Sequence, residues 1–158
     1  MQILLQEHRR LLKRLVEAKV EFILIGGYAV IYHGYPRTTD DLDIWVKPDN
    51  TNKEKLMTFF ANEGIRDEDV ETLREMDFTS THVFFLGEAP YQIDFLTKVQ
   101  GLNFGEAQKL QVYFDIDGLK IPVLNIDHLV ISKILSDRPK DKADLDELQK
   151  IIRMRKKN

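Results

Sequence analysis

Apolar residues recur along the chain with two spacings, one typical of helices and the other typical of strands. Between residues 3 and 18, leucines recur with charged residues between them, and their spacing predicts an amphipathic helix. Residues 21–25 form a short apolar run that ends at a pair of glycines, as expected for a buried strand followed by a tight turn. A short helix over residues 28–33 should follow, because Gly34 and Pro36 interrupt the chain there.

A second strand is predicted over residues 41–46, where aliphatic residues alternate with acidic or aromatic ones. Asp117-Gly118 lies between two apolar runs, and such a pair is typical of a β-hairpin turn. Residues 101–108 fit neither spacing and receive no assignment. The remaining elements are expected as helices over 52–63, 67–76, 125–136 and from Pro139 onward, and as strands over 81–86, 91–96, 111–116 and 119–123.

These elements predict an α+β fold in which a small mixed β-sheet has helices packed against it. A length of 158 residues suits one domain. We expect that domain to span residues 1–158, with a core over about 20–125 and C-terminal helices over about 125–155. Trp45 and the phenylalanines are expected in the core, and not as a platform on which nucleotide bases stack.

The composition narrows the class of protein and the kind of metal site. The chain is 43% hydrophobic and 31% charged, which is ordinary for a globular protein. It has no run of the roughly 18 apolar residues that would cross a membrane, and its start lacks the pattern of a signal peptide. We therefore expect a cytoplasmic protein without a membrane partner. Because the chain has no cysteine, any bound metal must have oxygen or imidazole ligands.

The charge distribution gives a weak indication about partners. The formal net charge is -3, which argues mildly against an unaided grip on long RNA. A basic cluster nevertheless ends the chain. We interpret it as the solvated end of a helix, where positive charges interact favourably with the helix dipole. Contact with RNA or phosphate is the alternative interpretation. The cluster consists of Arg153, Arg155, Lys156 and Lys157.

Three aspartates on predicted strands are the candidates for chemistry. Asp41 and Asp43 are two positions apart, so their side chains should leave the strand on the same face. Asp94 alternates with Ile93 and Phe95 on a later strand and should leave its sheet opposite those apolar side chains. Carboxylates placed together repel one another unless a proton or a cation joins them. Hard oxygen ligands of this kind suit magnesium or manganese, with substrate phosphates completing the shell.

The two glycines and the aspartates gain meaning from their order. Glycines that precede a helix let backbone N–H groups approach a phosphate, although a plain tight turn needs the same residues. Here an apolar residue, Gly26-Gly27, a spacer, Asp41-Leu42-Asp43 and a later aspartate follow one another. This order resembles the signature of the nucleotidyltransferase superfamily (DNA polymerase β-like). The segment up to Asp43 is most similar to a small bacterial and archaeal branch that includes AbiEii-type toxins.

The resemblance implies a nucleotidyltransferase that depends on magnesium or manganese. Such an enzyme moves a nucleoside monophosphate from an NTP, with ATP as the first candidate, to an acceptor hydroxyl on RNA, protein or a small molecule. A tRNA or a protein is among the acceptors that the family uses. The resemblance implies catalytic and metal-binding roles for Asp41, Asp43 and Asp94. The phosphate-binding residues that it implies are Gly26, Gly27, Arg37, Thr39 and Lys133.

Other interpretations remain open at this point. Arg37 is equally compatible with bracing its loop through backbone carbonyls, and Lys133 with a lysine that snorkels from a packed helix. The alternative for the whole chain is a catalytically inactive binding module, such as a partner subunit or the antitoxin of a toxin–antitoxin pair. A homo-oligomer or a partner chain that completes the substrate pocket is compatible with a domain of this size.

Overall fold

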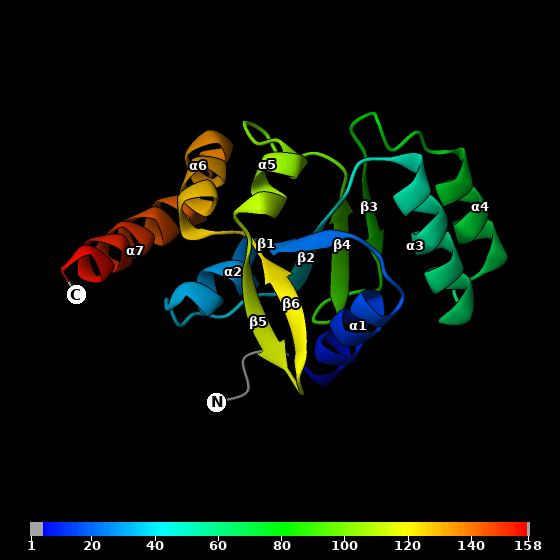
Figure 1. Ribbon diagram of the computed structural model, residues 1–158, viewed down its shortest axis with the longest axis horizontal. Helices are drawn as coiled ribbons and strands as arrows, with labels where there is room; N and C mark the ends of the chain where they lie inside the picture. The colour runs from blue at the N-terminus through cyan, green and yellow to red at the C-terminus, as the bar shows by residue number, and fades with distance from the viewer. Residues whose placement is uncertain (1–4, 158) are drawn as a thin grey trace.

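The computed structural model describes residues 5–157, which form one mixed sheet with helices on both of its faces (Figure 1). The six strands lie in the order β3-β4-β2-β1-β6-β5. The strands are β1 (Phe22–Ile25), β2 (Asp41–Val46), β3 (Val83–Leu86), β4 (Gln92–Leu96), β5 (Val112–Ile116) and β6 (Leu119–Val123). The helices are α1 (Gln6–Glu17), α2 (Gly26–His33), α3 (Asn50–Asn62), α4 (Asp67–Glu75), α5 (Phe104–Lys109), α6 (Ile126–Ser136) and α7 (Pro139–Lys156).

The structure confirms the expected α+β class, and each predicted strand and helix is present with small shifts at its ends. One helix was missed, because α5 is too short to show a helical spacing of apolar residues. Its signal is local: the Asn103 side chain accepts a hydrogen bond from the Glu106 backbone N–H at 3.0 Å and so caps the helix. The predicted beginning of the first helix, at residues 3 and 4, lies outside the described residues.

The register of three neighbouring strands determines which side chains share a face. β1 runs antiparallel to β2 with Ile25 opposite Asp43, and β2 runs parallel to β4 with Asp43 beside Asp94. Leu42 and Ile44 point to the other face of β2 and are fully buried there. The alternation predicted from the sequence therefore separates an apolar face from a face that carries carboxylates.

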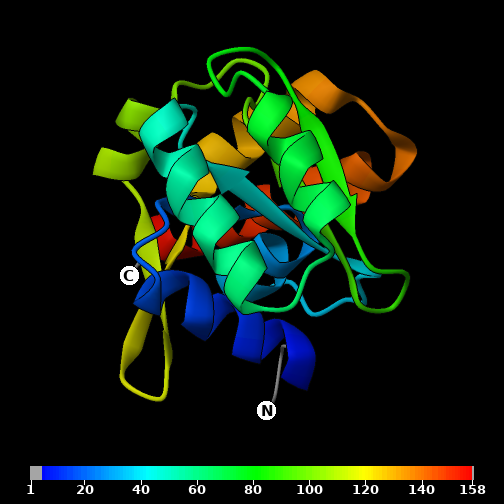
Figure 2. The ribbon, with the colours of Figure 1, turned by 90° about the vertical axis from the view of Figure 1, so that its right-hand side faces the viewer.

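The helices divide between the two faces of the sheet. Figure 2 shows α1, α3 and α4 in front of the strands and α6 and α7 behind them. On the first face, Phe60 of α3 meets Phe95 of β4 edge to face, with ring centres 5.4 Å apart. On the second face, Trp45 of β2 meets Phe104 of α5 in the same way at 5.1 Å. Among residues 5–157, no helix has the length and apolar character needed to cross a membrane.

The second face is covered only in part. The helix α2 packs on β1 and β2, whereas Val83 and Phe85 of the edge strand β3 are 50% and 60% exposed. The prediction that the phenylalanines lie in the core is therefore wrong for Phe85. Its strand lies at the edge of the sheet, and its side chain points to the half of the face that the helices leave open.

A buried ionic cluster joins the two C-terminal helices. The Lys133 ammonium on α6 lies 3.1 Å from an oxygen of Asp141 and 3.0 Å from an oxygen of Asp144, both on α7. All three side chains are at least 95% buried. Asp141 also accepts hydrogen bonds from the Ser136 hydroxyl and the Arg138 backbone N–H. Although burial raises the pKa of Asp141, these donors lower it well below the usual range for aspartate.

Removing one carboxylate from this cluster should destabilise the protein. We expect Asp141→Ala to lower the free energy of unfolding by about 3 kcal/mol, because it leaves a buried ammonium short of a partner. Thermal unfolding followed by circular dichroism measures the change. Lys150→Ala breaks an exposed pair with Glu147 on the same helix and should cost no more than about 0.5 kcal/mol. Equal losses of unfolding free energy in the two variants would show that the buried cluster stabilises the protein no more than an exposed ion pair.

Candidate active site

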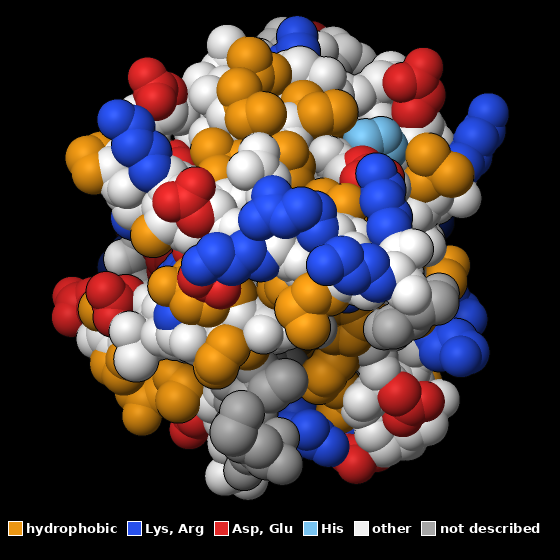
Figure 3. Space-filling view, turned by 90° about the vertical axis from the view of Figure 1, so that its left-hand side faces the viewer, with side chains coloured by type: hydrophobic (Ala, Val, Ile, Leu, Met, Phe, Trp, Pro, Cys, Tyr) orange, Lys and Arg blue, Asp and Glu red, His pale blue; other side chains and the backbone are white. Residues whose placement is uncertain are grey.

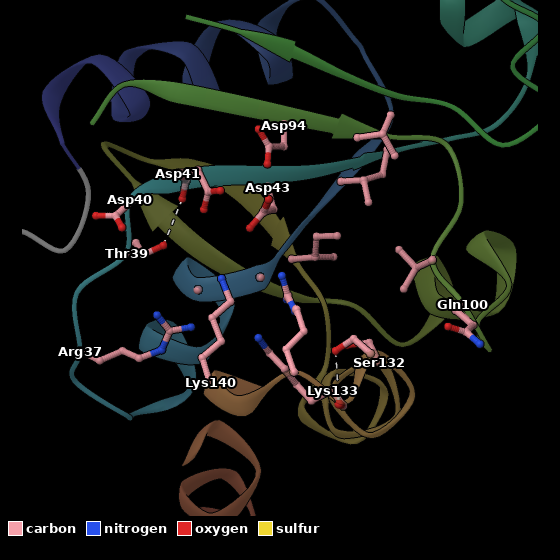
Figure 4. Close-up of a pocket in the computed structure, with 18 of the residues that line it drawn as sticks. Arg37, Thr39, Asp40, Asp41, Asp43, Asp94, Gln100, Ser132, Lys133 and Lys140 are labelled. Carbon is pink, nitrogen blue, oxygen red and sulfur yellow. Dashed lines mark hydrogen bonds between the residues drawn. The ribbon is translucent and has the colours of Figure 1, made fainter. Parts of the chain in front are cut away.

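Three carboxylates lie together where β2 and β4 run side by side. Asp41 and Asp43 come from β2, and Asp94 comes from the neighbouring position on β4. One oxygen from each side chain lies within 4.8 Å of the other two. Figure 4 shows the three aspartates on the strands at one side of a pocket, with Arg37, Lys133 and Lys140 at the other side. The structure thus brings together the three aspartates that the sequence pointed to.

The electrostatics of this cluster favour a cation or a proton. Burial raises the pKa of Asp43 to about 7, and the neighbouring charges of Asp41 and Asp94 act in the same direction. Burial and the charge of Asp94 also raise the pKa of Asp41, although the Lys140 ammonium opposes that rise. The Gln92 amide donates a hydrogen bond to Asp94 at 2.7 Å and holds its carboxylate in place. Divalent cations would relieve the repulsion that remains.

The two glycines begin α2 directly beside the carboxylates. Gly26 has a φ of +70°, and a Cβ atom at this residue would lie 2.1 Å from an oxygen of Asp43. A Cβ atom at Gly27 would lie 2.5 Å from the Thr39 hydroxyl. Neither position therefore has room for a side chain, and no described side chain caps the helix. Because Gly26 and Gly27 line the pocket, uncapped N–H groups of the first turn would be available there as donors to an anion.

Arg37 and Thr39 line the same pocket but are also tied to the protein itself. The Thr39 hydroxyl donates to the Asp41 carbonyl at 3.2 Å. One Arg37 nitrogen donates to the Thr38 carbonyl at 2.7 Å, and another donates to Asp144 at 3.0 Å. These contacts hold the loop before β2 in place. They leave the guanidinium at the pocket wall, so a role toward phosphate stays a prediction.

Lys133 also lines the pocket, but its charge is already neutralised by the two aspartates of α7. Its predicted binding of phosphate is not tested by this arrangement and stays a prediction. Lys140 is a cation that was not among the residues predicted for the site: it lies exposed at the first turn of α7 and faces the pocket (Figure 4). Because Pro139-Lys140 also suits an ordinary helix start, the sequence favoured that interpretation, and only the packing of α7 brings Lys140 to the aspartates.

The pocket that these residues enclose has a volume of about 560 Å³. The aspartates, the start of α2 and the cations from α6, α7 and the loop before β2 form its polar part. Val83 of β3, Leu96 of β4 and Val99 after β4 form a less polar wall. A cavity of this size with both kinds of wall can hold a nucleotide together with part of a second molecule.

The basic C-terminal cluster lies away from these residues. Figure 3 shows Lys and Arg side chains gathered across the face of the molecule at which α7 ends. Arg153, Arg155 and Lys156 are exposed there, but Arg155 also donates to the His33 carbonyl at 3.2 Å. This contact joins the end of α7 to the end of α2. None of the cluster's residues lines the pocket.

Two solved structures resemble this chain in fold. An antigenic nucleotidyltransferase-like protein from Paracoccidioides brasiliensis has a TM-score of 0.57 and 16% identity, over 92% of this chain and 73% of its own. The lincosamide antibiotic adenylyltransferase LnuA, solved with lincomycin bound, has a TM-score of 0.56 and 17% identity, over 92% of this chain and 96% of its own. At these identities the likeness concerns the fold. No curated protein matches the sequence.

The sequence itself carries the assignment to a family. Residues 4–158 match the family described as nucleotidyl transferase of unknown function (DUF2204). The match covers nearly the whole chain and confirms the resemblance to the nucleotidyltransferase superfamily, while the AbiEii-type branch stays a prediction. The glycines, the aspartates and the pocket between them thus lie in a protein that belongs to this nucleotidyl transferase family.

Proposed function

We propose that the protein transfers a nucleoside monophosphate from an NTP to an acceptor hydroxyl with the help of divalent cations. The observation that carries the proposal is the meeting of three carboxylates and an uncapped helix start in one pocket. The carboxylates suit the cations, and the helix start suits the phosphates that those cations accompany. ATP is the first nucleotide to test, because a protein of similar fold is an adenylyltransferase.

The donor set fits magnesium or manganese. Asp41, Asp43 and Asp94 offer only carboxylate oxygens, and their oxygen atoms are close enough to share ions. Bound there, the ions would lower the pKa of the acceptor hydroxyl and neutralise charge on the triphosphate. The raised pKa of Asp43 supports this role, since a carboxylate that repels its neighbours gains the most from a nearby cation.

The opposite side of the pocket suits the triphosphate. The N–H groups at the start of α2 would donate to phosphate oxygens, and the absence of a Cβ at Gly26 and Gly27 lets the backbone approach them. Lys140 and Arg37 would add positive charge at the pocket wall. Thr39 supports the site by tying its loop to the backbone of Asp41.

The reaction is an in-line displacement at the α-phosphate. The acceptor oxygen forms a bond to the α-phosphorus while the bond from that phosphorus to the bridging oxygen breaks, and the bond's electrons leave with pyrophosphate. Asp94 is the carboxylate best placed to receive the hydroxyl proton, because it lies on the strand farther from the start of α2. Positioning and charge neutralisation would supply most of the catalysis.

Removing one carboxylate should abolish both nucleotide binding and transfer. We expect wild-type protein with magnesium and ATP to unfold at a higher temperature than without them, and we expect Asp41→Ala to lose that stabilisation. Labelled product from α-labelled ATP in cell extract should fall by at least about 1000-fold in the variant. Asp146→Asn removes the same charge from an exposed position on α7 and should behave as wild type.

The result also separates an enzyme from a binding module. Metal-dependent stabilisation by ATP without any labelled product in extract would favour a module that binds nucleotide but has lost catalysis. Stabilisation by ATP that survives in Asp41→Ala would rule out the proposed site. Light scattering on the same samples identifies a homo-oligomer.

Two glycines with a similar left-handed backbone conformation separate the effect on the site from the effect on general stability. Gly26 and Gly64 have φ values of +70° and +79°, but only at Gly26 would a Cβ meet a neighbour within 4 Å. Replacing either by alanine should cost about 1–2 kcal/mol of stability through the left-handed backbone. Only Gly26→Ala should also displace Asp43 and weaken the stabilisation by magnesium and ATP, measured by thermal shift. Equal metal responses in the two variants would contradict the close approach at Gly26.

The stability of the metal-free protein should depend on the charge of Asp43. Its folded pKa of about 7 exceeds the ordinary 3.8, so the neutral form favours folding below about pH 4, and this advantage is lost as the pH rises through 7. In EDTA at pH 8, Asp43→Asn should therefore raise the free energy of unfolding by roughly 2–4 kcal/mol. The gain should shrink toward pH 4, and Asp146→Asn should show no such trend. If Asp43→Asn were less stable than wild type at pH 8, the idea that burying the charged Asp43 destabilises the fold would be wrong.

A further inference from the structure

The groups of the site lie in a fixed order across the sheet. The start of α2 follows β1, next comes β2 with Asp41 and Asp43, then β4 with Asp94, and finally the edge strand β3. Figure 4 shows Lys140 below the aspartates and the strand that carries Asp94 above them. The groups suited to phosphate therefore lie on one side of the carboxylates, and β3 lies on the other.

The geometry of in-line displacement determines the side from which the acceptor approaches. The attacking oxygen must approach the phosphorus from the side opposite the leaving pyrophosphate. If the β- and γ-phosphates lie at the start of α2, the acceptor approaches over Asp94 and β3. The side chains of β3 on this face are then the ones that the acceptor contacts first.

Two apolar side chains of β3 point to this face. Phe85 pairs with Asp94 and Val83 pairs with Leu96 in the antiparallel register, and directly opposed residues share a face. Phe85 is 60% exposed and Val83 is 50% exposed, and Val83 lines the pocket. Their neighbour Phe84 points to the other face, where it stacks on Phe95 with ring centres 5.1 Å apart.

The charges around the pocket differ between its two sides. Arg37, Arg138 and Lys140 line the side of the pocket formed by the loop before β2 and by the C-terminal helices. Among the described lining residues that come from β3, β4 and the segment after β4, Lys98 is the single cation. A phosphodiester chain would need several cations along its path. An exposed ring beside an aliphatic side chain better suits an apolar or aromatic ring of a small molecule.

We propose that Phe85 and Val83 form the acceptor subsite, and that the acceptor is a small hydroxylated compound with a ring beside its reacting hydroxyl group. This inference rests on the proposed function and adds the class of acceptor to it. The ring packs on Phe85 and against Val83, while the hydroxyl reaches Asp94. Phe85 is thus a specificity-determining residue. In the free protein its aromatic side chain is exposed on an edge strand, which is an unfavourable place for it.

Two matched probes test the subsite without knowledge of the natural acceptor. 4-Nitrophenyl β-D-glucoside and methyl β-D-glucoside share their hydroxyl groups, but only the first has an aromatic ring. Binding is measured by ligand-observed NMR with full-length protein, magnesium and a non-hydrolysable ATP analogue. We expect the nitrophenyl glucoside to bind about 10-fold more tightly than the methyl glucoside, as stacking on an aromatic side chain would give.

Variants test whether the difference in affinity between the two glucosides depends on β3. Phe85→Ala should remove it, Phe85→Tyr should retain it, and Leu110→Ala, which truncates another side chain that is 60% exposed, should leave it unchanged. All three variants should keep the thermal stabilisation by magnesium and ATP. Equal binding of the two glucosides, or a difference that persists in Phe85→Ala, would overturn the subsite and leave the proposed function standing.

Three further outcomes would also count against the inference. Absence of any metal-dependent response to ATP in the wild-type protein would remove the proposed function, and the subsite with it. Labelling of tRNA but of no ring-bearing alcohol by α-labelled ATP would overturn the class of acceptor. Loss of a dimer in Phe85→Ala, seen by light scattering, would assign the exposed strand to contact between two copies of the chain.

Discussion

The repulsion between three neighbouring carboxylates is the constraint around which the rest of the structure is arranged. The parallel register of β2 and β4 brings Asp43 and Asp94 side by side, and their oxygens lie with one from Asp41 within 4.8 Å. Isolated carboxylates would move apart, but backbone hydrogen bonds between the strands prevent this. The fold therefore maintains an unfavourable concentration of negative charge, which only cations or protons relieve. Gly26 belongs to the same constraint, because a side chain there would displace Asp43.

The wall opposite the aspartates is stabilised by a second cluster of charges. Asp144 contacts both the Arg37 guanidinium and the Lys133 ammonium, so it joins the loop before β2 to α6 and α7. Buried charges are costly unless they are paired, and here each buried carboxylate has at least one cationic partner. The C-terminal helices consequently depend on the same residues that line the pocket. Because Lys140 lies in the first turn of α7, movement of this helix would displace it relative to Asp41.

The sequence predicted the parts of this arrangement that depend on local spacing. Two aspartates two positions apart on a strand must share a face, and alternation with Ile93 and Phe95 was enough to orient Asp94. Contacts between distant segments were beyond reach: the parallel register of β2 and β4, the ion pairs of Lys133 and the approach of Lys140 all depend on tertiary packing. The short helix α5 was not predicted, because six residues are too few to show the helical spacing of apolar positions. Phe85 was placed in the core because its residue type favours burial, whereas its exposure depends on where α2 stops covering the sheet.

The partial cover of one sheet face links these features to function. The helix α2 covers the part of the face over β1 and β2, and the groups suited to phosphate lie on that side of the aspartates. The half over β3 and β4 has no helix among the described residues, and only the side chains of two strands decide what fits against it. In the proposed reaction the donor is always a nucleoside triphosphate, whereas acceptors can differ in size and chemistry. If the proposed assignment of the two sides holds, the phosphate side is built from buried ion pairs and tight glycines and the acceptor side from exposed strand residues, and the second can change without disturbing the first.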